Sequence, residues 1–183
     1  MPSGVTLAVV GAGDRGTGHA RWALAHPERA TVVAVAEPRT VRRDRFAAAH
    51  GLDAGAAVDD WRVLAARGRV ADAVLICTLD REHLEPVLAF AALGYHIMLE
   101  KPMALTEEEC RRIVAAVEEA GVILSVGHVL RYTPTRRRSN ASSTPAGSET
   151  SSASSTWNRS GSGTRPTPSC AATGAARTRP PPC

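Results

Sequence analysis

The sequence predicts an α/β fold, a doubly wound parallel sheet with helices on both faces, over residues 1–134 and a disordered, low-complexity tail over residues 135–183. Before Pro134, short apolar runs alternate strictly with helical patterns, which is typical of such a sheet. Residues 135–183 contain no Leu, Ile, Val, Met, Phe or Tyr. A segment of this composition buries too little apolar area to offset the roughly 1–2 kcal/mol of backbone entropy that each ordered residue costs.

Strands are predicted where short runs are rich in Val and Ala, because continuous apolar runs are typical of parallel strands buried on both faces. These runs are Val5–Val10, Thr31–Ala36, Ala73–Cys77, Tyr95–Leu99 and Val122–Val126, with a very short further strand around Ala56–Val58. Helical patterns lie between them, at Arg15–Ala25, Val41–His50, Trp61–Ala66, Glu82–Leu93 and Glu107–Ala120. With right-handed crossovers, the expected strand order is 3-2-1-4-5-6.

The last helix has the clearest predicted boundaries. Thr106 precedes three glutamates, so its hydroxyl can cap the helix while the carboxylates lie at the positive end of the helix dipole. Gly121 directly follows the pattern and predicts its end.

The charge of the chain is uneven. Residues 135–183 carry seven arginines and one glutamate, a net charge of +6 against +4 for the whole chain, which leaves −2 for residues 1–134. The tail lacks the interleaved aromatic residues that stack bases, so no nucleic-acid partner is expected. No apolar run approaches the roughly 20 residues of a membrane span, and the four cysteines show neither CxxC nor metal-site spacing. We therefore expect a cytoplasmic protein with reduced thiols, no metal site and no membrane partner.

A GxGxxG motif follows the first predicted strand and opens a helix, with the residues Gly11, Ala12, Gly13, Asp14, Arg15 and Gly16. In a dinucleotide-binding turn, the first glycine permits the tight turn, the second lets the backbone approach the pyrophosphate, and the third allows close helix–strand packing. The free N–H groups at the helix start bind the phosphates. A bare motif is weak evidence, since glycine turns are common.

The second strand supplies the supporting signal. It ends at Glu37, about 20 residues on, where a carboxylate hydrogen-bonds the hydroxyls of the adenosine ribose. We therefore predict a Rossmann NAD(P)-binding domain, with an ordinary turn and a solvated glutamate as the alternative. Glu37 favours NAD, because a carboxylate repels a 2′-phosphate. Arg39 can instead meet that phosphate, so NADP is the alternative cofactor.

Three further segments lie at the ends of later strands. Glu100, Lys101 and Pro102 follow the fifth strand, and a Thr-x-x-x-x-His segment, Thr78–His83, follows the fourth. The stretch Gly127–Tyr132 leaves the last strand. In this combination the chain resembles the glucose–fructose oxidoreductase / inositol dehydrogenase (Gfo/Idh/MocA) family from about residue 5 to residue 134.

The resemblance implies that Lys101 lies beside the nicotinamide and contacts the reacting hydroxyl. An ammonium there favours the developing alkoxide and can relay its proton. On its own, a lysine before a proline at a strand end is more often a solvated loop charge. Glu100 would orient Lys101 or the cofactor, and Pro102 would belong to the same cofactor-binding motif.

Two histidines keep alternative interpretations. Thr78 and His83 would line the cofactor cleft, although a histidine on the first turn of a helix is just as often a cap. His128 lies either in the cleft or in the core.

The function implied by the resemblance is an NAD(P)-dependent oxidoreductase that transfers hydride between nicotinamide and a hydroxyl of a small sugar, polyol or inositol-like substrate. Intact members would be homo-oligomers. Their second domain, an open antiparallel sheet, supplies the substrate pocket and a further acid–base pair, and nothing after Pro134 could build it. We therefore expect a truncated and inactive version. The alternatives are a non-catalytic NAD(H)-sensing module, which has no need of Lys101, and a fragment of an NAD-dependent glycosidase of the same family.

A single-base deletion at about Pro134/Thr135 would explain the tail. Read with high-GC codons in the neighbouring frame, residues 135–183 give a continuous family-like sequence without a stop, and the Trp157–Asn158 junction forces a glutamate there. Sequencing the gene across the codons for Tyr132–Arg138 should find one missing base. An unchanged reading frame in independent DNA preparations would refute this frameshift hypothesis.

Overall fold

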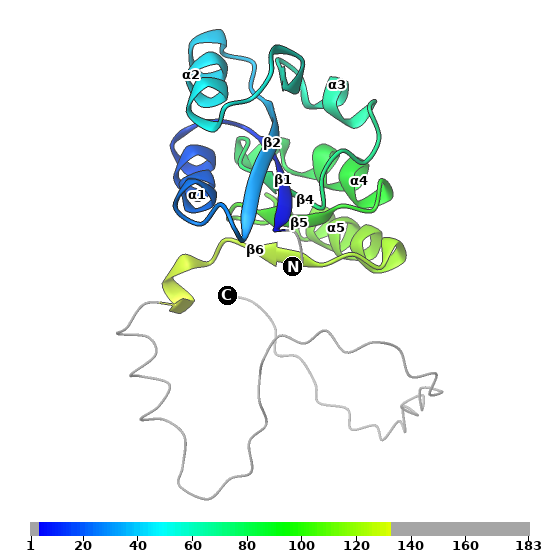
Figure 1. The fold of residues 1–183 in the computed structure, drawn as a ribbon. Helices are drawn as coiled ribbons and strands as arrows, with labels where there is room; N and C mark the ends of the chain where they lie inside the picture. The colour runs from blue at the N-terminus through cyan, green and yellow to red at the C-terminus, as the bar shows by residue number, and fades with distance from the viewer. Residues whose placement is uncertain (1–3, 133–183) are drawn as a thin grey trace, which may run out of the picture. The chain divides into compact units, whose positions relative to one another are not determined.

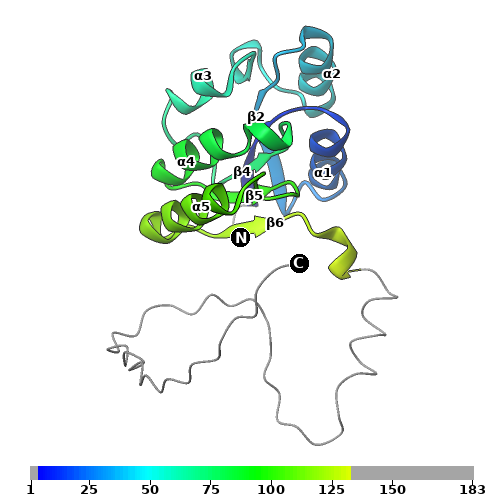
Figure 2. The ribbon, with the colours of Figure 1, turned by 180° about the vertical axis from the view of Figure 1, so that it is seen from behind.

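The computed structural model describes residues 4–132, which form a six-stranded parallel sheet between two layers of helices (Figures 1 and 2). The strands are β1 (Val5–Val10), β2 (Ala30–Ala36), β3 (Ala57–Val58), β4 (Ala73–Ile76), β5 (His96–Leu99) and β6 (Leu124–Val126). Their order is β3-β2-β1-β4-β5-β6, and every pair of neighbours is parallel. The predicted fold class and strand order are therefore confirmed, including the very short third strand.

The helices divide between the two faces of the sheet. Figure 1 shows α1 (Asp14–Ala25) and α2 (Thr40–His50) on one side of the sheet. On the other side lie α3 (Trp61–Ala65), α4 (Leu84–Ala92) and α5 (Glu107–Ala120), as the view from behind also shows (Figure 2). Short 3-10 turns occur at Ala54–Ala56, Asp80–Glu82 and Val129–Tyr132.

Strand residues alternate between two buried clusters, one under each helical layer. Val9 of β1 packs with Ala20 and Phe46 beneath α1 and α2. Its neighbours Ala8 and Val10 belong to the larger cluster, together with Phe90, Leu99 and Ile113. Because each fully buried large apolar side chain contributes about 1.5–3 kcal/mol, these two clusters hold the helices against the sheet.

Helix α4 begins two residues later than predicted, at Leu84 instead of Glu82. Pro86 explains the shift, because proline has no N–H to donate and is tolerated in the first turn of a helix but not further inside. A start at Leu84 leaves Pro86 in the first turn. The preceding residues Asp80–Glu82 form a 3-10 turn.

Tyr95 lies just before β5, although it was predicted to begin that strand. Its ring is fully buried and packs edge-on against Phe90, with 5.1 Å between the ring centroids. The hydroxyl donates to the carbonyl oxygen of Gly68 at 2.9 Å and accepts the N–H of Val70 at 2.7 Å. These two hydrogen bonds hold the loop between α3 and β4, so Tyr95 serves the loop more than the strand.

The boundaries of α5 are confirmed. The hydroxyl of Thr106 accepts the N–H of Glu109 at 3.2 Å, and the carboxylate of Glu109 accepts the N–H of Thr106 at 3.1 Å, which completes a capping box. Gly121 ends the helix with a left-handed φ of 64°.

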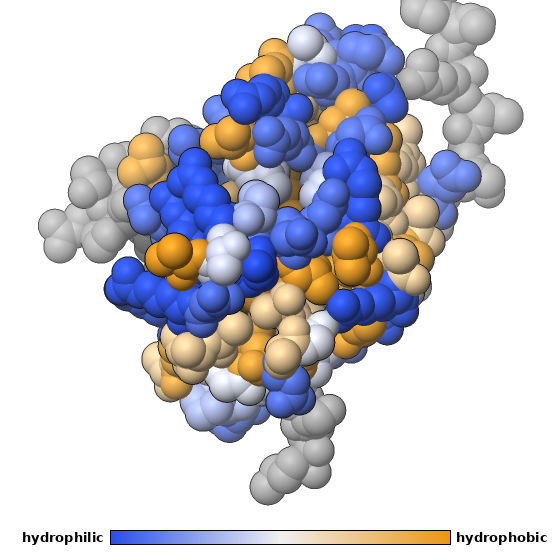
Figure 3. Space-filling model, turned by 90° about the horizontal axis from the view of Figure 1, so that it is seen from above, coloured by the Kyte–Doolittle hydropathy of each residue, from blue (hydrophilic) through white to orange (hydrophobic). Residues whose placement is uncertain are grey.

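The described helices and surface can be compared with the sequence analysis in two respects, membrane-spanning length and the position of the predicted tail. In the part of the chain that the structure describes, no helix is long and apolar enough to cross a membrane. On the face shown in Figure 3, hydrophilic and apolar side chains are interspersed. The predicted tail and the boundary at residues 134 and 135 lie outside the described residues.

Two glycines of α1 stand in opposite environments. A Cβ atom at Gly16 would lie 1.9 Å from the carbonyl oxygen of Gly11, so only a hydrogen atom fits between α1 and the end of β1. A Cβ atom at Gly18, half a turn further, would have no atom within 4 Å. Gly16 is therefore required by packing, whereas Gly18 is not.

We predict that Gly16→Ala lowers the free energy of unfolding by about 1–3 kcal/mol, because the added methyl group must displace α1 from β1. Gly18→Ala is the matched control and should raise the free energy of unfolding by about 0.5–1 kcal/mol, since alanine favours the helix and meets no neighbour. Urea denaturation followed by circular dichroism measures both. Equal effects of the two substitutions would contradict the packing argument.

Candidate active site

The predicted site residues meet at one edge of the sheet, where the parallel strands have their carboxyl ends. Backbone hydrogen bonds continue across this edge beyond the strands themselves. Gly11 N–H donates to the Ala36 carbonyl at 2.8 Å, and Cys77 N–H donates to the Val10 carbonyl at 2.8 Å. Glu100 N–H donates to the Ile76 carbonyl at 2.9 Å. The loops after β1, β2, β4 and β5 therefore leave the sheet at one level, as expected for a ligand site in such a fold.

The glycine-rich loop has the features of a phosphate site. Gly11 has a φ of 91°, and a Cβ atom there would lie 2.6 Å from the carbonyl oxygen of Cys77, so the turn requires glycine. At Gly13 a Cβ atom would meet only a guanidinium nitrogen of Arg42, at 3.5 Å. Packing among the described residues therefore does not demand a glycine at this position, whereas the close approach of a pyrophosphate would.

The start of α1 is open to an anion. Gly13 occupies the N-cap position and no side chain caps the helix, so its first N–H groups have no side-chain partner among residues 4–132. Asp14 and Arg15 lie in the first turn with exposed side chains. Together with the dipole of α1, these N–H groups fit a diphosphate group.

Glu37 is buried and holds the glycine-rich loop. Its carboxylate accepts the N–H of Ala12 at 2.8 Å with one oxygen and the N–H of Arg39 at 3.1 Å with the other. The side chain of Arg43 donates to the Glu37 carbonyl at 2.9 Å. Glu37 thus lies where the ribose of a dinucleotide is expected, and it also links the ends of β1 and β2. Its contact with a ribose stays a prediction, as does the role of Arg39, which is exposed.

Thr78 and His83 take different positions after β4. Thr78 is partly exposed, and its hydroxyl donates to the Glu82 carbonyl at 3.3 Å. His83 is fully buried, with Nδ1 2.9 Å from the carbonyl oxygen of Pro102. The structure therefore places His83 beneath the turn that carries Lys101, away from the surface of an open cleft. It lies at the N-cap position of α4 but makes no side-chain cap.

The tautomer of His83 follows from these contacts. A carbonyl oxygen only accepts, so Nδ1 carries the proton that it donates to Pro102. Nε2 has no hydrogen-bond partner among the described residues. His83 therefore anchors the turn through one nitrogen, and its action on any ligand would pass through Pro102.

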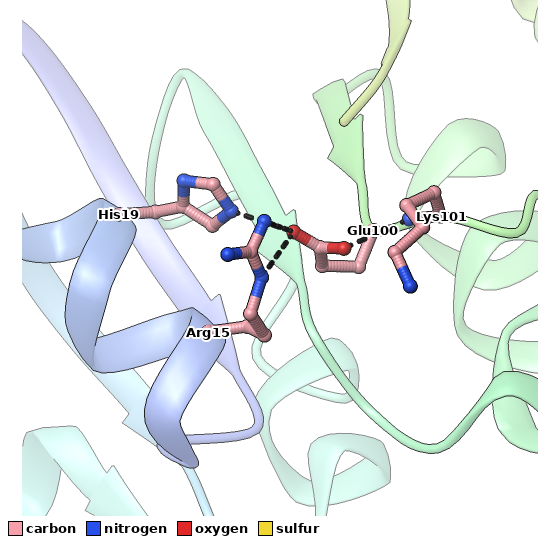
Figure 4. A network of polar contacts seen from close by, with 4 residues as sticks. All are labelled: Arg15, His19, Glu100 and Lys101. Carbon is pink, nitrogen blue, oxygen red and sulfur yellow. Dashed lines mark hydrogen bonds and ion pairs between the residues drawn. The ribbon is translucent and has the colours of Figure 1, made fainter. Parts of the chain in front are cut away.

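Glu100 is the centre of a network that joins α1 to the end of β5 (Figure 4). One carboxylate oxygen accepts from Arg15 Nε at 2.9 Å, from Arg15 Nη2 at 2.8 Å and from His19 Nε2 at 2.8 Å. The other oxygen accepts the N–H of Lys101 at 3.0 Å. Arg15 is predicted to bind the cofactor, and this stays a prediction: Glu100 takes two of the guanidinium nitrogens, while the half-exposed side chain and the backbone N–H at the start of α1 keep donors for a phosphate.

The electrostatics of this network favour the ionised form of Glu100. Burial by itself raises the pKa of the carboxyl, but hydrogen bonds from His19, Arg15 and the Lys101 N–H outweigh it and hold the pKa below its ordinary value. The stability that this carboxylate contributes is therefore complete above its unfolded-state pKa. It is lost as the pH falls through the lower pKa of the folded chain.

Lys101 presents its side chain to solvent from a fixed turn. Its backbone is held by Glu100 on one side, and His83 holds the next carbonyl, that of Pro102. The Lys101–Pro102 peptide bond is cis. The side chain is exposed, and Figure 4 shows it on the opposite side of Glu100 from Arg15 and His19. Lys101 is the only lysine of the chain.

His19 is the residue of this site that sequence reasoning missed. It lies four residues after Arg15 on α1, so both side chains share one face of the helix. That spacing was visible in the sequence, but the partner, Glu100, is 81 residues away from His19. His128, which had two interpretations, is exposed and therefore not part of the core.

Two further features lie near the site without belonging to its chemistry. Burial, and secondarily the charge of Glu100, raises the pKa of the Cys77 thiol to about 12, so this cysteine is not a nucleophile at neutral pH. A groove of about 460 Å³ lies between α1 and α2 and shares only the start of α1 and its loop with the predicted site. Within residues 4–132 no group of three or more His, Cys, Asp or Glu is placed to hold a metal ion.

Comparison with known proteins shows the family to which this domain belongs. Residues 5–128 match the model of the Gfo/Idh/MocA family, described as an oxidoreductase family with an NAD-binding Rossmann fold. The chain is 37% identical over 127 residues to inositol 2-dehydrogenase of Klebsiella pneumoniae, covering 69% of this chain and 37% of that protein. It is 33% identical over 134 residues to the NAD⁺-dependent scyllo-inositol 2-dehydrogenase of Bacillus subtilis, covering 73% of this chain and 38% of that protein.

Among solved structures, the WlbA dehydrogenase of Bordetella pertussis in complex with NADH and UDP-GlcNAcA superposes with a TM-score of 0.68 at 28% identity. The match covers 74% of this chain and 40% of that one. The chain thus spans less than half the length of these relatives. It belongs to the Gfo/Idh/MocA oxidoreductase family through its NAD-binding Rossmann-fold domain.

Proposed function

We propose that this chain carries the NAD-binding and hydride-transfer site of a dehydrogenase that acts on a hydroxyl group of a sugar, polyol or inositol-like substrate. One observation carries the proposal. Lys101 stands exposed on a turn that Glu100 and His83 fix at the same sheet edge as the glycine-rich loop. A nicotinamide dinucleotide that begins on this loop would extend along that edge.

Different residues of the site would bind different parts of the dinucleotide. The N–H groups at the start of α1 would hold the pyrophosphate, and the open side of Gly13 would let it approach. Glu37 would accept hydrogen bonds from the adenosine ribose, in addition to the two backbone N–H groups that it already accepts. Its negative charge disfavours a 2′-phosphate, which supports NAD over NADP. When bound, the nicotinamide supplies the hydride acceptor or donor.

Lys101 would act on the substrate hydroxyl. Its ammonium would hold the oxygen and stabilise the alkoxide that develops as hydride leaves the carbon, and it would relay the proton of the hydroxyl to solvent. The exposed side chain suits this task, because no described residue forms an ion pair with its ammonium group. Thr78 lies partly exposed at the same sheet edge and is the remaining polar candidate for the cofactor cleft.

The relatives support the substrate class. Proteins 33–37% identical to this chain are named as inositol dehydrogenases, and the structure of a 28% identical protein contains NADH and a nucleotide sugar acid. Because the chain spans only about 37–40% of their length, the substrate, the homo-oligomeric state and a cytoplasmic location are part of this proposal. The frameshift and the inactivity that it implies concern residues outside those described and stay predictions.

We predict that Glu37→Ala weakens NAD binding by about 1–3 kcal/mol, because the ribose loses a charged hydrogen-bond partner and the Ala12 N–H loses its acceptor. Discrimination against NADP should weaken in the same variant. Calorimetric titration of the 183-residue chain with both cofactors measures this, with Arg39→Ala as the matched control that should leave NAD affinity almost unchanged. Equal affinity of the unmodified chain for NAD and NADP would show that Glu37 does not set the choice.

We further predict that Lys101→Ala lowers kcat by about 10²–10⁴-fold, the usual contribution of a general acid–base group, while NADH still binds. Lys101→Arg is the informative control, since arginine keeps the charge but cannot release its proton. NAD reduction should be assayed against a panel of polyols and sugars, with the Lys101 variants compared in the frame-restored protein. The 183-residue chain is expected to show no turnover, and robust turnover by it would refute the predicted truncation. NADH binding without turnover in the frame-restored protein would favour the non-catalytic sensing module.

A further inference from the structure

We propose that Arg15 and His19 are positioning residues that hold the Glu100 carboxylate and thereby transmit occupancy of the glycine-rich loop to the turn that carries Lys101. The inference rests on the proposed function, because it assigns significance to where Lys101 lies. It concerns residues that act through Glu100 and not on a substrate themselves.

The contacts define a bridge with two ends. Arg15 and His19, from consecutive turns of α1, bind one oxygen of Glu100 at 2.8–2.9 Å, while the other oxygen accepts the N–H of Lys101 at 3.0 Å. A carboxylate has a planar, rigid shape. A shift of α1 that carries Arg15 and His19 would therefore rotate or release the oxygen that Lys101 binds.

Burial makes this bridge obligatory for Glu100. Its side chain is only 6% exposed, against 52% for Arg15 and 22% for His19. A buried carboxylate without partners is strongly unfavourable, and among the described residues its side-chain partners, Arg15 and His19, come from α1 alone. Arg15 and His19 therefore supply the side-chain hydrogen bonds for a carboxylate oxygen that the end of β5 does not satisfy by itself.

Packing leaves the carboxylate little freedom to find another position. A Cβ atom at Gly127 would lie 3.2 Å from Glu100 Oε1, so the loop after β6 already closes on this oxygen. Glu100 is thus confined between α1, Gly127 and its own turn. A displacement of Arg15 or His19 would therefore change the hydrogen bond between Glu100 and the Lys101 N–H.

The coupling to a ligand comes from the position of Arg15 in the chain. Its backbone N–H belongs to the first turn of α1, where a pyrophosphate would bind, while its side chain holds Glu100. The same residue therefore touches both the expected anion site and the bridge. An anion that fixes the first turn of α1 would also fix the Glu100 carboxylate, and with it the turn at Lys101.

The composition of the chain allows a direct test. Because Lys101 is its only lysine, the full chain labelled with ¹⁵N-lysine gives a single backbone amide resonance, that of the N–H which donates to Glu100. In Arg15→Ala and His19→Ala we expect this proton to move upfield and to exchange with solvent about tenfold faster, as for loss of one charge-assisted hydrogen bond. His19→Gln, whose side-chain amide can still donate to the carboxylate, should restore most of the original resonance.

Controls separate this effect from general damage to α1. Arg21→Ala changes an exposed arginine of the same helix that lines the groove between α1 and α2, and it should leave the Lys101 resonance unchanged. Circular dichroism melting of each variant reports whether it folds. An unchanged Lys101 resonance in folded Arg15→Ala and His19→Ala would overturn the positioning role.

The coupling has its own measurement. Saturating NADH should shift the Lys101 amide of the unmodified chain, and the shift should be lost in folded Arg15→Ala and His19→Ala at NADH concentrations that still saturate them by fluorescence. Bound NADH without any change at Lys101 in the unmodified chain would overturn the coupling. If NADH does not bind the unmodified chain at all, the proposed function and the coupling both fail, whereas the ligand-free variants still decide the positioning role.

Discussion

The close approach of α1 to the end of β1 is the constraint on which the rest of the site depends. Only a hydrogen atom at position 16 fits against the carbonyl oxygen of Gly11, and this contact sets how deeply α1 sits on the sheet. The start of α1 then lies at the sheet edge with its N–H groups open, and Arg15 and His19 reach across to the end of β5. A larger residue at this position would displace the phosphate site and the partners of Glu100 together.

Two buried carboxylates use this edge in parallel ways. Glu37, at the end of β2, accepts the backbone N–H of Ala12 from the glycine-rich loop. Glu100, at the end of β5, accepts the backbone N–H of Lys101 and the side chains of α1. Each is buried, and each joins a strand end to a neighbouring loop, so that the charge is satisfied by the segments that it orders. The halves of the site expected to face adenosine and nicotinamide are therefore built on the same principle.

The turn at Lys101 combines a fixed backbone with a free side chain. Glu100 accepts the Lys101 N–H, and the buried His83 donates to the Pro102 carbonyl. Preorganisation of this kind places the ammonium group while leaving its own hydrogen-bond donors free, which suits the substrate contact proposed for Lys101. His83 contributes to the site by supporting the backbone, although it never reaches the surface.

The sequence by itself determined the parallel strands, the capping box at Thr106 and the glycine-rich turn, because apolar periodicity, caps and turn glycines are local signals. The strand order followed from the general rule that crossovers between parallel strands are right-handed. Only the tertiary structure decided the pairing of Arg15 and His19 with Glu100, the burial of His83 under Pro102 and the contact of Glu37 with Ala12. These partners lie 19 to 85 residues apart. The glycine spacing predicts that α1 packs closely on the sheet, but which side chains then meet across such separations depends on the three-dimensional arrangement of the helices and loops.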